Sequence, residues 1–149
     1  MSQSYYRKTA QRGEEGFTLV ELMVVIVILG LLATIVAINV LPATGKANVQ
    51  KAKTDIATIE QALEMYRLDN LTYPSSTEGL QALVAPPPGM GQPQRYRQGG
   101  YVKRLPNDPW GNPYRYTYPG QHGAFDVFSL GADNKEGGEG ENADIGNWQ

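Results

Sequence analysis

The segment Glu14–Gly30, "EEGFTLVELMVVIVILG", joins a charged start to an apolar run and decides the fold of this chain. Residues 19–38, "LVELMVVIVILGLLATIVAI", are almost entirely apolar and lack the polar stripe that an amphipathic core helix shows. As a helix that rises about 1.5 Å per residue, this run extends roughly 30 Å, which is the hydrocarbon thickness of a bilayer. The run therefore predicts a membrane-spanning helix.

Three positive charges precede the apolar run: Arg7, Lys8 and Arg12. Because positively charged flanks stay on the cytoplasmic side, they predict a cytoplasmic N-terminus and a C-terminal part across the membrane. A cleaved secretory signal peptide would share the charged start, but its apolar core is usually about 7–15 residues long. The small residues around Ala43 in "VLPATGKA" keep that alternative open.

Composition limits the classes of function. The 149 residues have room for one modest domain besides the apolar segment. A formal net charge of -2 gives no basic face for nucleic acid, and the absence of cysteine excludes a disulfide framework. The single histidine, His122, lies in the turn-forming stretch "GQHGAF", and no nucleophile or zinc motif accompanies it. We therefore expect neither an enzyme nor a nucleic-acid binder.

Beyond the apolar run, over residues 42–70, apolar residues recur at steps of three and four. This spacing predicts an amphipathic helix that continues the first one and packs on the rest of the chain. Pro42 lies at the junction, where it could bend the helix. The expected apolar face consists of Val49, Ala52, Ile56, Ile59, Leu63 and Tyr66, with Lys51, Asp55, Glu60 and Arg67 outside.

Residues 71–149 contain many turn-forming residues and predict a β-rich globular part. Ser75 and Glu78 have the spacing of a capping box for a short helix over about residues 77–84, and residues 86–94 predict an exposed loop. Strands are expected in "YRYTY" and "FDVFSL". The predicted fold class is α+β: a long N-terminal helix, transmembrane in its first half, packed on a small antiparallel sheet.

The C-terminal segment 130–148, "LGADNKEGGEGENADIGNW", places acidic residues among glycines. Hard cations such as Ca²⁺ bind carboxylate and backbone oxygens, which a glycine-rich loop can turn inward. The spacing is not that of an EF-hand, because Gly137 stands where Asp or Asn is needed. From the residues alone, a solvated acidic loop and a metal site both stay open.

The sequence "GFTLVEL" behind a short basic leader resembles the type IV prepilin processing motif, shared by type IV pilins and type II secretion pseudopilins. The resemblance implies that a prepilin peptidase cleaves after Gly16, which makes residues 1–16 a leader, and N-methylates Phe17. It further implies that Glu21 pairs with the terminal ammonium group of a neighbouring subunit during assembly. An unpaired charge near the bilayer centre costs roughly 3 kcal/mol. By itself, Glu21 could also reach the membrane interface.

Three further stretches resemble, in order, the major pseudopilins of type II secretion systems: "YPSSTEGLQALV", "GGYVKRLPNDPWGNPY" and "PGQHGAFDVFSLGADNKEGGEGENADIGNW". The resemblance implies a subunit of a periplasmic pseudopilus, which polymerises through a spanning and assembly helix over residues 17–41 and its continuation. It also implies a calcium ion in the C-terminal loop. The implied ligands are the side chains of Asp133 and Asp144 and the backbone oxygens of Leu130 and near Asn142.

The same resemblance implies a location and a set of partners. The chain is expected in the bacterial inner membrane as a single-pass protein with a periplasmic C-terminal domain. Expected partners are further copies in a helical filament, minor pseudopilins, the prepilin peptidase, the inner-membrane secretion platform and the secretin channel. Two alternatives stay open. A type IV pilin commonly has a C-terminal cysteine pair, which is missing here; the other is a single-span calcium-binding periplasmic module that does not polymerise.

Overall fold

The computed structural model describes residues 16–149, and the chain divides into two units, residues 1–40 and 41–149. Helix α1, Leu19–Asn70, contributes to both units, and its backbone is helical through Pro42. The prediction of one long N-terminal helix is therefore confirmed. The expected leader, apart from Gly16, and the three positive charges before the apolar run lie outside the described residues.

The described part of the first unit is the N-terminal portion of α1 and the short segment before it. All its large apolar side chains between Phe17 and Ile38 are exposed in the single chain, from 50% at Val25 to 84% at Phe17. The helix is long and apolar enough to cross a membrane, and none of its most apolar stretch is buried within the chain. Each exposed Å² of apolar surface costs about 25 cal/mol in water. This portion therefore needs lipid or other protein around it.

In the second unit, the C-terminal half of α1 carries the predicted apolar face. Its core positions are at most 3% exposed, and Val49 is partly buried against them. The buried positions are Ala52, Ile56, Ile59, Leu63 and Tyr66. The placement of Asp55 outside was wrong: its side chain is only 19% exposed, because the hydroxyl group of Tyr114 reaches across to it.

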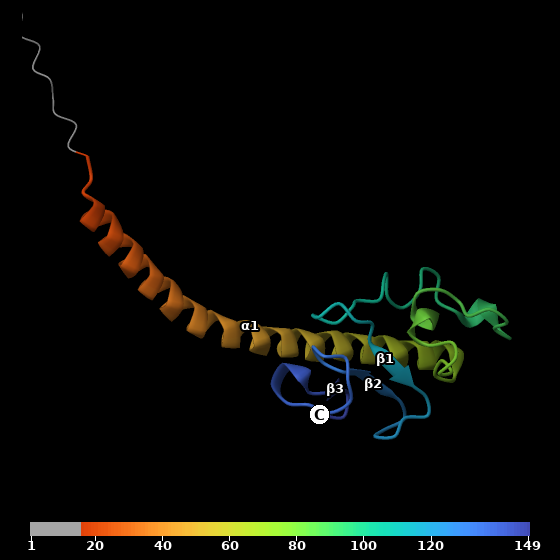
Figure 1. Cartoon of the computed structure of the whole chain (residues 1–149). Helices are drawn as coiled ribbons and strands as arrows, with labels where there is room; N and C mark the ends of the chain where they lie inside the picture. Colours follow the sequence, from red (N-terminus) through yellow and green to blue (C-terminus); the bar gives the residue numbers. More distant parts are fainter. Residues whose placement is uncertain (1–15) are drawn as a thin grey trace, which may run out of the picture. The chain divides into compact units, whose positions relative to one another are not determined.

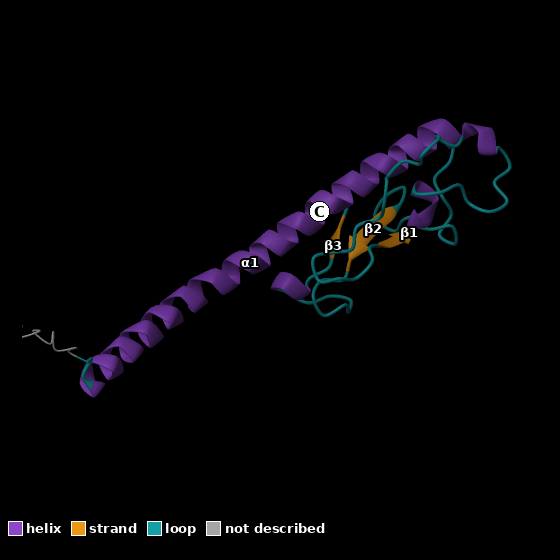
Figure 2. Cartoon of the chain, turned by 90° about the horizontal axis from the view of Figure 1, so that it is seen from above, coloured by secondary structure: helices purple, strands orange, loops and turns teal. Residues whose placement is uncertain are grey.

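A three-stranded antiparallel sheet of order β1-β2-β3 lies alongside this half of α1 (Figures 1 and 2). Its strands are β1, Arg115–Thr117, β2, Asp126–Ser129, and β3, Ile145–Gly146. The first two lie where strands were predicted. The third was not predicted, because two residues give no periodicity to read. Its Ile145 nevertheless joins Val127 of β2 in the buried core that α1 completes.

The helix predicted over about residues 77–84 is shorter and of another type. The capping box forms: Glu78 N donates to Ser75 Oγ at 3.2 Å, and Ser75 N donates to Glu78 Oε2 at 2.7 Å. It closes a turn, and a 3₁₀-helix, Leu80–Leu83, follows. Gly79 separates the two with a φ of 62°, a left-handed conformation that no α-helix adopts. The loop after it is mostly exposed, as predicted, although Pro87 is buried.

Candidate functional site

Glu21 lies in the first turn of α1, where its carboxylate caps the helix. Thr18 donates to Glu21 Oε2 from its backbone N–H at 2.8 Å and from its hydroxyl group at 3.0 Å. In return, the backbone N–H of Glu21 donates to Thr18 Oγ1 at 3.2 Å. This reciprocal pattern is a capping box. Thr18 was missed as a functional residue, although the stretch "TLVE" carries the signal for it.

Both bonds to the Glu21 carboxylate end on Oε2. The other oxygen, Oε1, therefore stays available within residues 16–149 for a second partner, such as an ammonium group. A carboxylate can accept about four hydrogen bonds, so the cap does not exhaust it. Helix capping and charge pairing are thus compatible roles for one side chain.

The predicted cleavage site lies just before this helix. Gly16 and Phe17 are both exposed, and a side chain at position 16 would meet no heavy atom within 4 Å. The glycine is therefore not demanded by packing among the described residues. Cleavage and methylation at this bond stay predictions.

The C-terminal loop is closed by its own backbone. Ala132 N–H donates to the carbonyl oxygen of Glu141 at 2.8 Å, which brings the two ends of the loop together. Gly131 has a φ of 70°, and a Cβ there would lie 2.6 Å from that same carbonyl oxygen and 2.8 Å from the carbonyl carbon of Asn142. Only glycine fits so close an approach. The fold therefore brings the backbone of Gly131, the residue after Leu130, close to the backbone of Glu141 and Asn142.

Asp144 offers an oxygen for which the chain itself supplies no partner. Its Oδ2 accepts a hydrogen bond of 3.0 Å from Gly137 N, whereas its Oδ1 is buried without a hydrogen-bond partner among the described residues. A buried, unsatisfied polar atom costs roughly 1–3 kcal/mol, more when it is charged. A bound cation at Oδ1 would remove that cost, so Asp144 fits the predicted role of metal ligand.

Among the described residues, the side chain of Asp133 bonds only within its own turn. It is exposed, and its Oδ1 accepts a hydrogen bond from Lys135 N at 3.2 Å, a contact within the same turn. No group of three or more His, Cys, Asp or Glu side chains gathers within residues 16–149 in a way that could hold a metal. A cation here would consequently depend on backbone oxygens as well as carboxylates, as in the predicted ligand set. The close approach of Gly131 to Glu141 and Asn142 is compatible with that ligand set, and the roles of Leu130, Asp133, Asn142 and Asp144 as ligands stay predictions.

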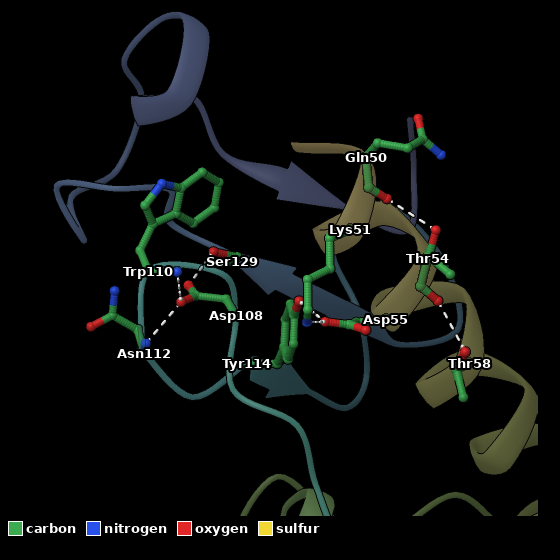
Figure 3. Close-up of polar contacts among 10 residues, drawn as sticks. All are labelled: Gln50, Lys51, Thr54, Asp55, Thr58, Asp108, Trp110, Asn112, Tyr114 and Ser129. Atoms are coloured by element: carbon green, nitrogen blue, oxygen red, sulfur yellow. Dashed lines mark hydrogen bonds and ion pairs between the residues drawn. The ribbon is translucent and has the colours of Figure 1, made fainter. Parts of the chain in front are cut away.

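A buried carboxylate that sequence reasoning missed adjoins the start of this loop. Asp108 is 4% exposed; its Oδ1 accepts the backbone N–H groups of Trp110 at 3.1 Å and Asn112 at 2.8 Å (Figure 3). Its Oδ2 accepts a hydrogen bond of 2.6 Å from the hydroxyl group of Ser129, the last residue of β2. Ser129 Oγ in turn accepts the backbone N–H of Gly131 at 3.1 Å. The turn-forming stretch "NDPWGN" signals the local bonds, but nothing in the sequence signals the link to Ser129.

His122 is a structural residue of the turn before β2. Its Nδ1 lies 3.0 Å from Oδ2 of the buried Asp126, and its ring stacks on Trp148 at 4.0 Å between centroids. Burial raises the pKa of Asp126, but hydrogen bonds from Gln121 and His122 outweigh it and hold that pKa below its ordinary value. The side chain of His122 thus fastens the turn to the C-terminal segment.

Comparison with known families and proteins agrees with these features. Residues 39–148 match the family described as "Type II secretion system (T2SS), protein G", and residues 11–37 match the "Prokaryotic N-terminal methylation motif". The second match includes the capping box of α1, and the first includes the complete C-terminal loop.

Individual relatives cover almost the whole chain. The type II secretion system core protein G of Vibrio cholerae serotype O1 is 58% identical over 137 residues, covering 92% of this chain and 93% of that protein. The protein of the same name from Pseudomonas aeruginosa is 55% identical over 138 residues, covering 93% of this chain and 97% of that protein. The crystal structure of the major pseudopilin from the type 2 secretion system of enterohaemorrhagic Escherichia coli has a TM-score of 0.64 and 45% identity. The match covers 74% of this chain and 94% of the chain in that crystal structure.

Proposed function

Because this chain belongs to the type II secretion system protein G family, we propose that it is the core structural subunit of a periplasmic pseudopilus. Copies of the chain polymerise through their N-terminal helices into a helical filament, whose growth drives the export of folded proteins across the outer membrane. The observation that carries this proposal is the apolar N-terminal portion of α1, whose large side chains are all exposed and which begins within the N-terminal methylation motif. A filament core of packed helices buries the side chains that a lone chain leaves exposed.

Assembly begins with processing. The prepilin peptidase cleaves the bond between Gly16 and Phe17 and methylates the new terminal nitrogen. The terminal ammonium group then needs an anionic partner within an apolar surrounding. Glu21 of a neighbouring copy offers Oε1, while Oε2 keeps the helix capped through Thr18. Pairing between copies sets the axial register of the filament.

Before assembly, the chain is anchored in the inner membrane by its single apolar helix, with its N-terminus in the cytoplasm and its globular part in the periplasm. The filament contacts minor pseudopilins, the inner-membrane secretion platform and the secretin channel. Neither catalysis nor nucleic-acid binding belongs to this role. The acidic C-terminal loop and the net charge of -2 support the absence of a nucleic-acid partner.

Calcium stabilises the globular part in this proposal. The backbone oxygens of Leu130 and Asn142 and the carboxylates of Asp133 and Asp144 hold the ion at the closure of the C-terminal loop. The orphaned, buried Oδ1 of Asp144 supports this assignment. The ion supplies positive charge to a loop that carries Asp133, Glu136, Glu139, Glu141 and Asp144. Calcium binds such oxygen-rich sites in flexible geometries.

Replacement of the host's own protein tests the proposed role. A bacterium that lacks its core protein G is supplied with this chain, and secretion of a type II substrate and pseudopilus formation on overexpression are followed together. Restored secretion with periplasmic filaments is expected. Surface fibres without secretion would instead support a type IV pilin, and a membrane-bound monomer without filaments would support the non-polymerising module.

A further inference from the structure

We propose that the buried carboxylate of Asp108 positions the calcium-binding loop through Ser129. This inference rests on the calcium site of the proposed function and extends it to residues outside the ligand set. Asp108 precedes Ser129 by 21 residues, and both are buried, at 4% and 1% exposure. They are positioning residues, which act on the ion through the backbone that they hold.

The first link is that hydrogen bonds within its own turn fix the position of Asp108. Its Oδ1 accepts two backbone N–H groups, from Trp110 and Asn112. Its own backbone N–H donates to the carbonyl oxygen of Asn112 at 2.8 Å, and its carbonyl oxygen accepts Gly111 N–H at 3.0 Å. Two hydrogen bonds to the carboxylate and two to the Asp108 backbone hold this residue within one turn. Oδ2 therefore presents a fixed acceptor to Ser129 at the end of β2 (Figure 3).

The second link is the hydroxyl group of Ser129. A hydroxyl group has one proton to donate and two lone pairs to accept. Because Oγ lies 2.6 Å from the acceptor-only carboxylate of Asp108, its proton points there. Its lone pairs are thereby left to accept the backbone N–H of Gly131. The carboxylate therefore sets the direction of the second hydrogen bond as well as the first.

The third link is the peptide unit that joins Leu130 to Gly131. This unit is planar and trans, so its N–H and C=O groups point in opposite directions. A hydrogen bond that fixes Gly131 N–H toward Ser129 consequently fixes the carbonyl oxygen of Leu130 on the other side of the plane. That carbonyl oxygen is one of the proposed calcium ligands. Gly131, with a φ of 70°, has no side chain that would restrict the orientation of this peptide plane, so the hydrogen bond to Ser129 restricts it instead.

Ser129 also affects the other side of the site. In the antiparallel register of β2 and β3, Ser129 pairs with Ile145, the residue after Asp144. One residue thus joins the segment that provides Leu130 to the segment that provides the orphaned carboxylate oxygen of Asp144. Residues that orient metal ligands in this way typically change metal affinity by about 10–100-fold when they are replaced.

The chain contains a matched control for a merely structural effect. Tyr114 donates its hydroxyl proton to the carboxylate of Asp55 at 2.9 Å, a bond of the same chemical type in the same unit (Figure 3). It joins α1 to the segment before β1 and has no hydrogen bond to the loop. Tyr114→Phe should lower stability without altering the calcium ligands, whereas Ser129→Ala should alter both.

The test is calcium titration of the full chain in detergent micelles, by calorimetry, for the unmutated protein and for Ser129→Ala, Asp108→Asn, their double variant and Tyr114→Phe. Ser129→Ala should raise the Kd for calcium at least about tenfold, and Asp108→Asn should raise it less. In the Ser129→Ala background, Asp108→Asn should have no further effect, because the link is already broken. Tyr114→Phe should leave the Kd within about twofold.

The possible results distinguish the positioning role of Asp108 and Ser129 from calcium binding itself. Equal Kd values for Ser129→Ala and Tyr114→Phe, with calcium bound tightly by both, would overturn the positioning role and leave the calcium site intact. An absence of calcium binding by the unmutated chain would remove both. If Ser129→Ala proves too unstable to titrate, Asp108→Asn provides the test instead. Amide exchange of the segment that contains Gly131, measured without calcium, should then be faster in that variant than in the unmutated chain, and unchanged exchange would refute the proposal.

Discussion

The hydroxyl group of Tyr114 donates a 2.9 Å hydrogen bond to Oδ2 of Asp55, the same oxygen that forms an ion pair with Lys51. Because hydrogen bonds to charged groups contribute about 1.5–3 kcal/mol, Tyr114→Phe should destabilise the globular part toward the low end of that range. A decrease of several degrees in melting temperature, followed by near-ultraviolet circular dichroism, is expected. The control is Tyr118→Phe, because the Tyr118 hydroxyl group makes no hydrogen bond within the described residues. An equal decrease in both variants would contradict the role given to Asp55.

Alkaline pH should unfold the globular part, because its buried tyrosines resist ionisation. Burial, with smaller contributions from Glu78 and nearby tyrosines, raises the pKa of Tyr66 to about 12. Burial and then the bond to Asp55 raise the pKa of Tyr114 further, and burial also raises that of Tyr116. A raised folded-state pKa gives stability that is complete below the unfolded value, about 10, and is lost as pH rises through the folded value.

Melting temperatures should consequently hold steady up to about pH 9 and fall above pH 10. The phenolate absorbance of these side chains, recorded in the same scan, should appear only together with unfolding. Ionisation of all nine tyrosines near pH 10 in a chain that keeps its near-ultraviolet dichroism would contradict the prediction.

Gly16→Val should block maturation without altering the fold. No heavy atom lies within 4 Å of a side chain at this position, so the described structure tolerates the change. The peptidase, by contrast, must accommodate the residue at the bond that it cleaves. Intact-mass measurement of protein from membranes should find the uncleaved chain. Gly30→Ala is the matched control, since a side chain there also meets nothing within 4 Å; it should be processed and methylated normally.

Glu21→Gln should separate helix capping from charge pairing. The amide oxygen of Gln can still accept the hydrogen bonds from Thr18, so the helix start is retained. Membrane insertion should improve slightly, because a charge is removed from the span. Filaments should nevertheless fail or form poorly, as judged by electron microscopy, because the ammonium group of Phe17 loses its anionic partner. Filaments of normal number and length would refute pairing between subunits.

Calcium should raise the melting temperature of the full chain in detergent, relative to chelator. A ligand that binds only the folded state contributes about 2.7 kcal/mol at one hundred times its Kd. Asp144→Ala should abolish the difference, because it removes the carboxylate whose Oδ1 lacks a partner. Glu139→Ala, an exposed acid of the same loop, should retain most of it. Melting curves that are indifferent to calcium would identify the segment as a solvated acidic loop.

The helical half of this fold could be predicted because its signals are local. Apolar residues at steps of three and four determine which face of α1 is buried, and Ile56, Ile59 and Leu63 follow that spacing without exception. An uninterrupted apolar run similarly distinguishes the membrane-spanning part. The strands β1 and β2 carry enough aromatic and β-branched residues to be placed within a residue or two.

The relationships that shape the C-terminal loop could not be predicted, because they join residues that are distant in sequence. Strand β3 is too short to show alternation and exists only because β2 offers it hydrogen bonds. The bond between Asp108 and Ser129 depends on a register that two separate turns must establish first. Thr18 is different: its capping box with Glu21 is local, and applying to "TLVE" the spacing rule used for Ser75 and Glu78 would have found it.

The buried face of α1 has a consequence for the order of events during synthesis. The helix is made early, but the groups that cover it come late. Tyr114 follows its partner Asp55 by 59 residues. Glu141 follows its partner Asn48, from which it accepts a hydrogen bond, by 93 residues. At about 5–20 residues per second, the second interval takes on the order of ten seconds. During that time the nascent helix presents an apolar face without its own sheet, a period in which a chaperone or a neighbouring chain can bind first. Closing such long loops is also slow, so the globular part should fold more slowly than a helical bundle of equal length.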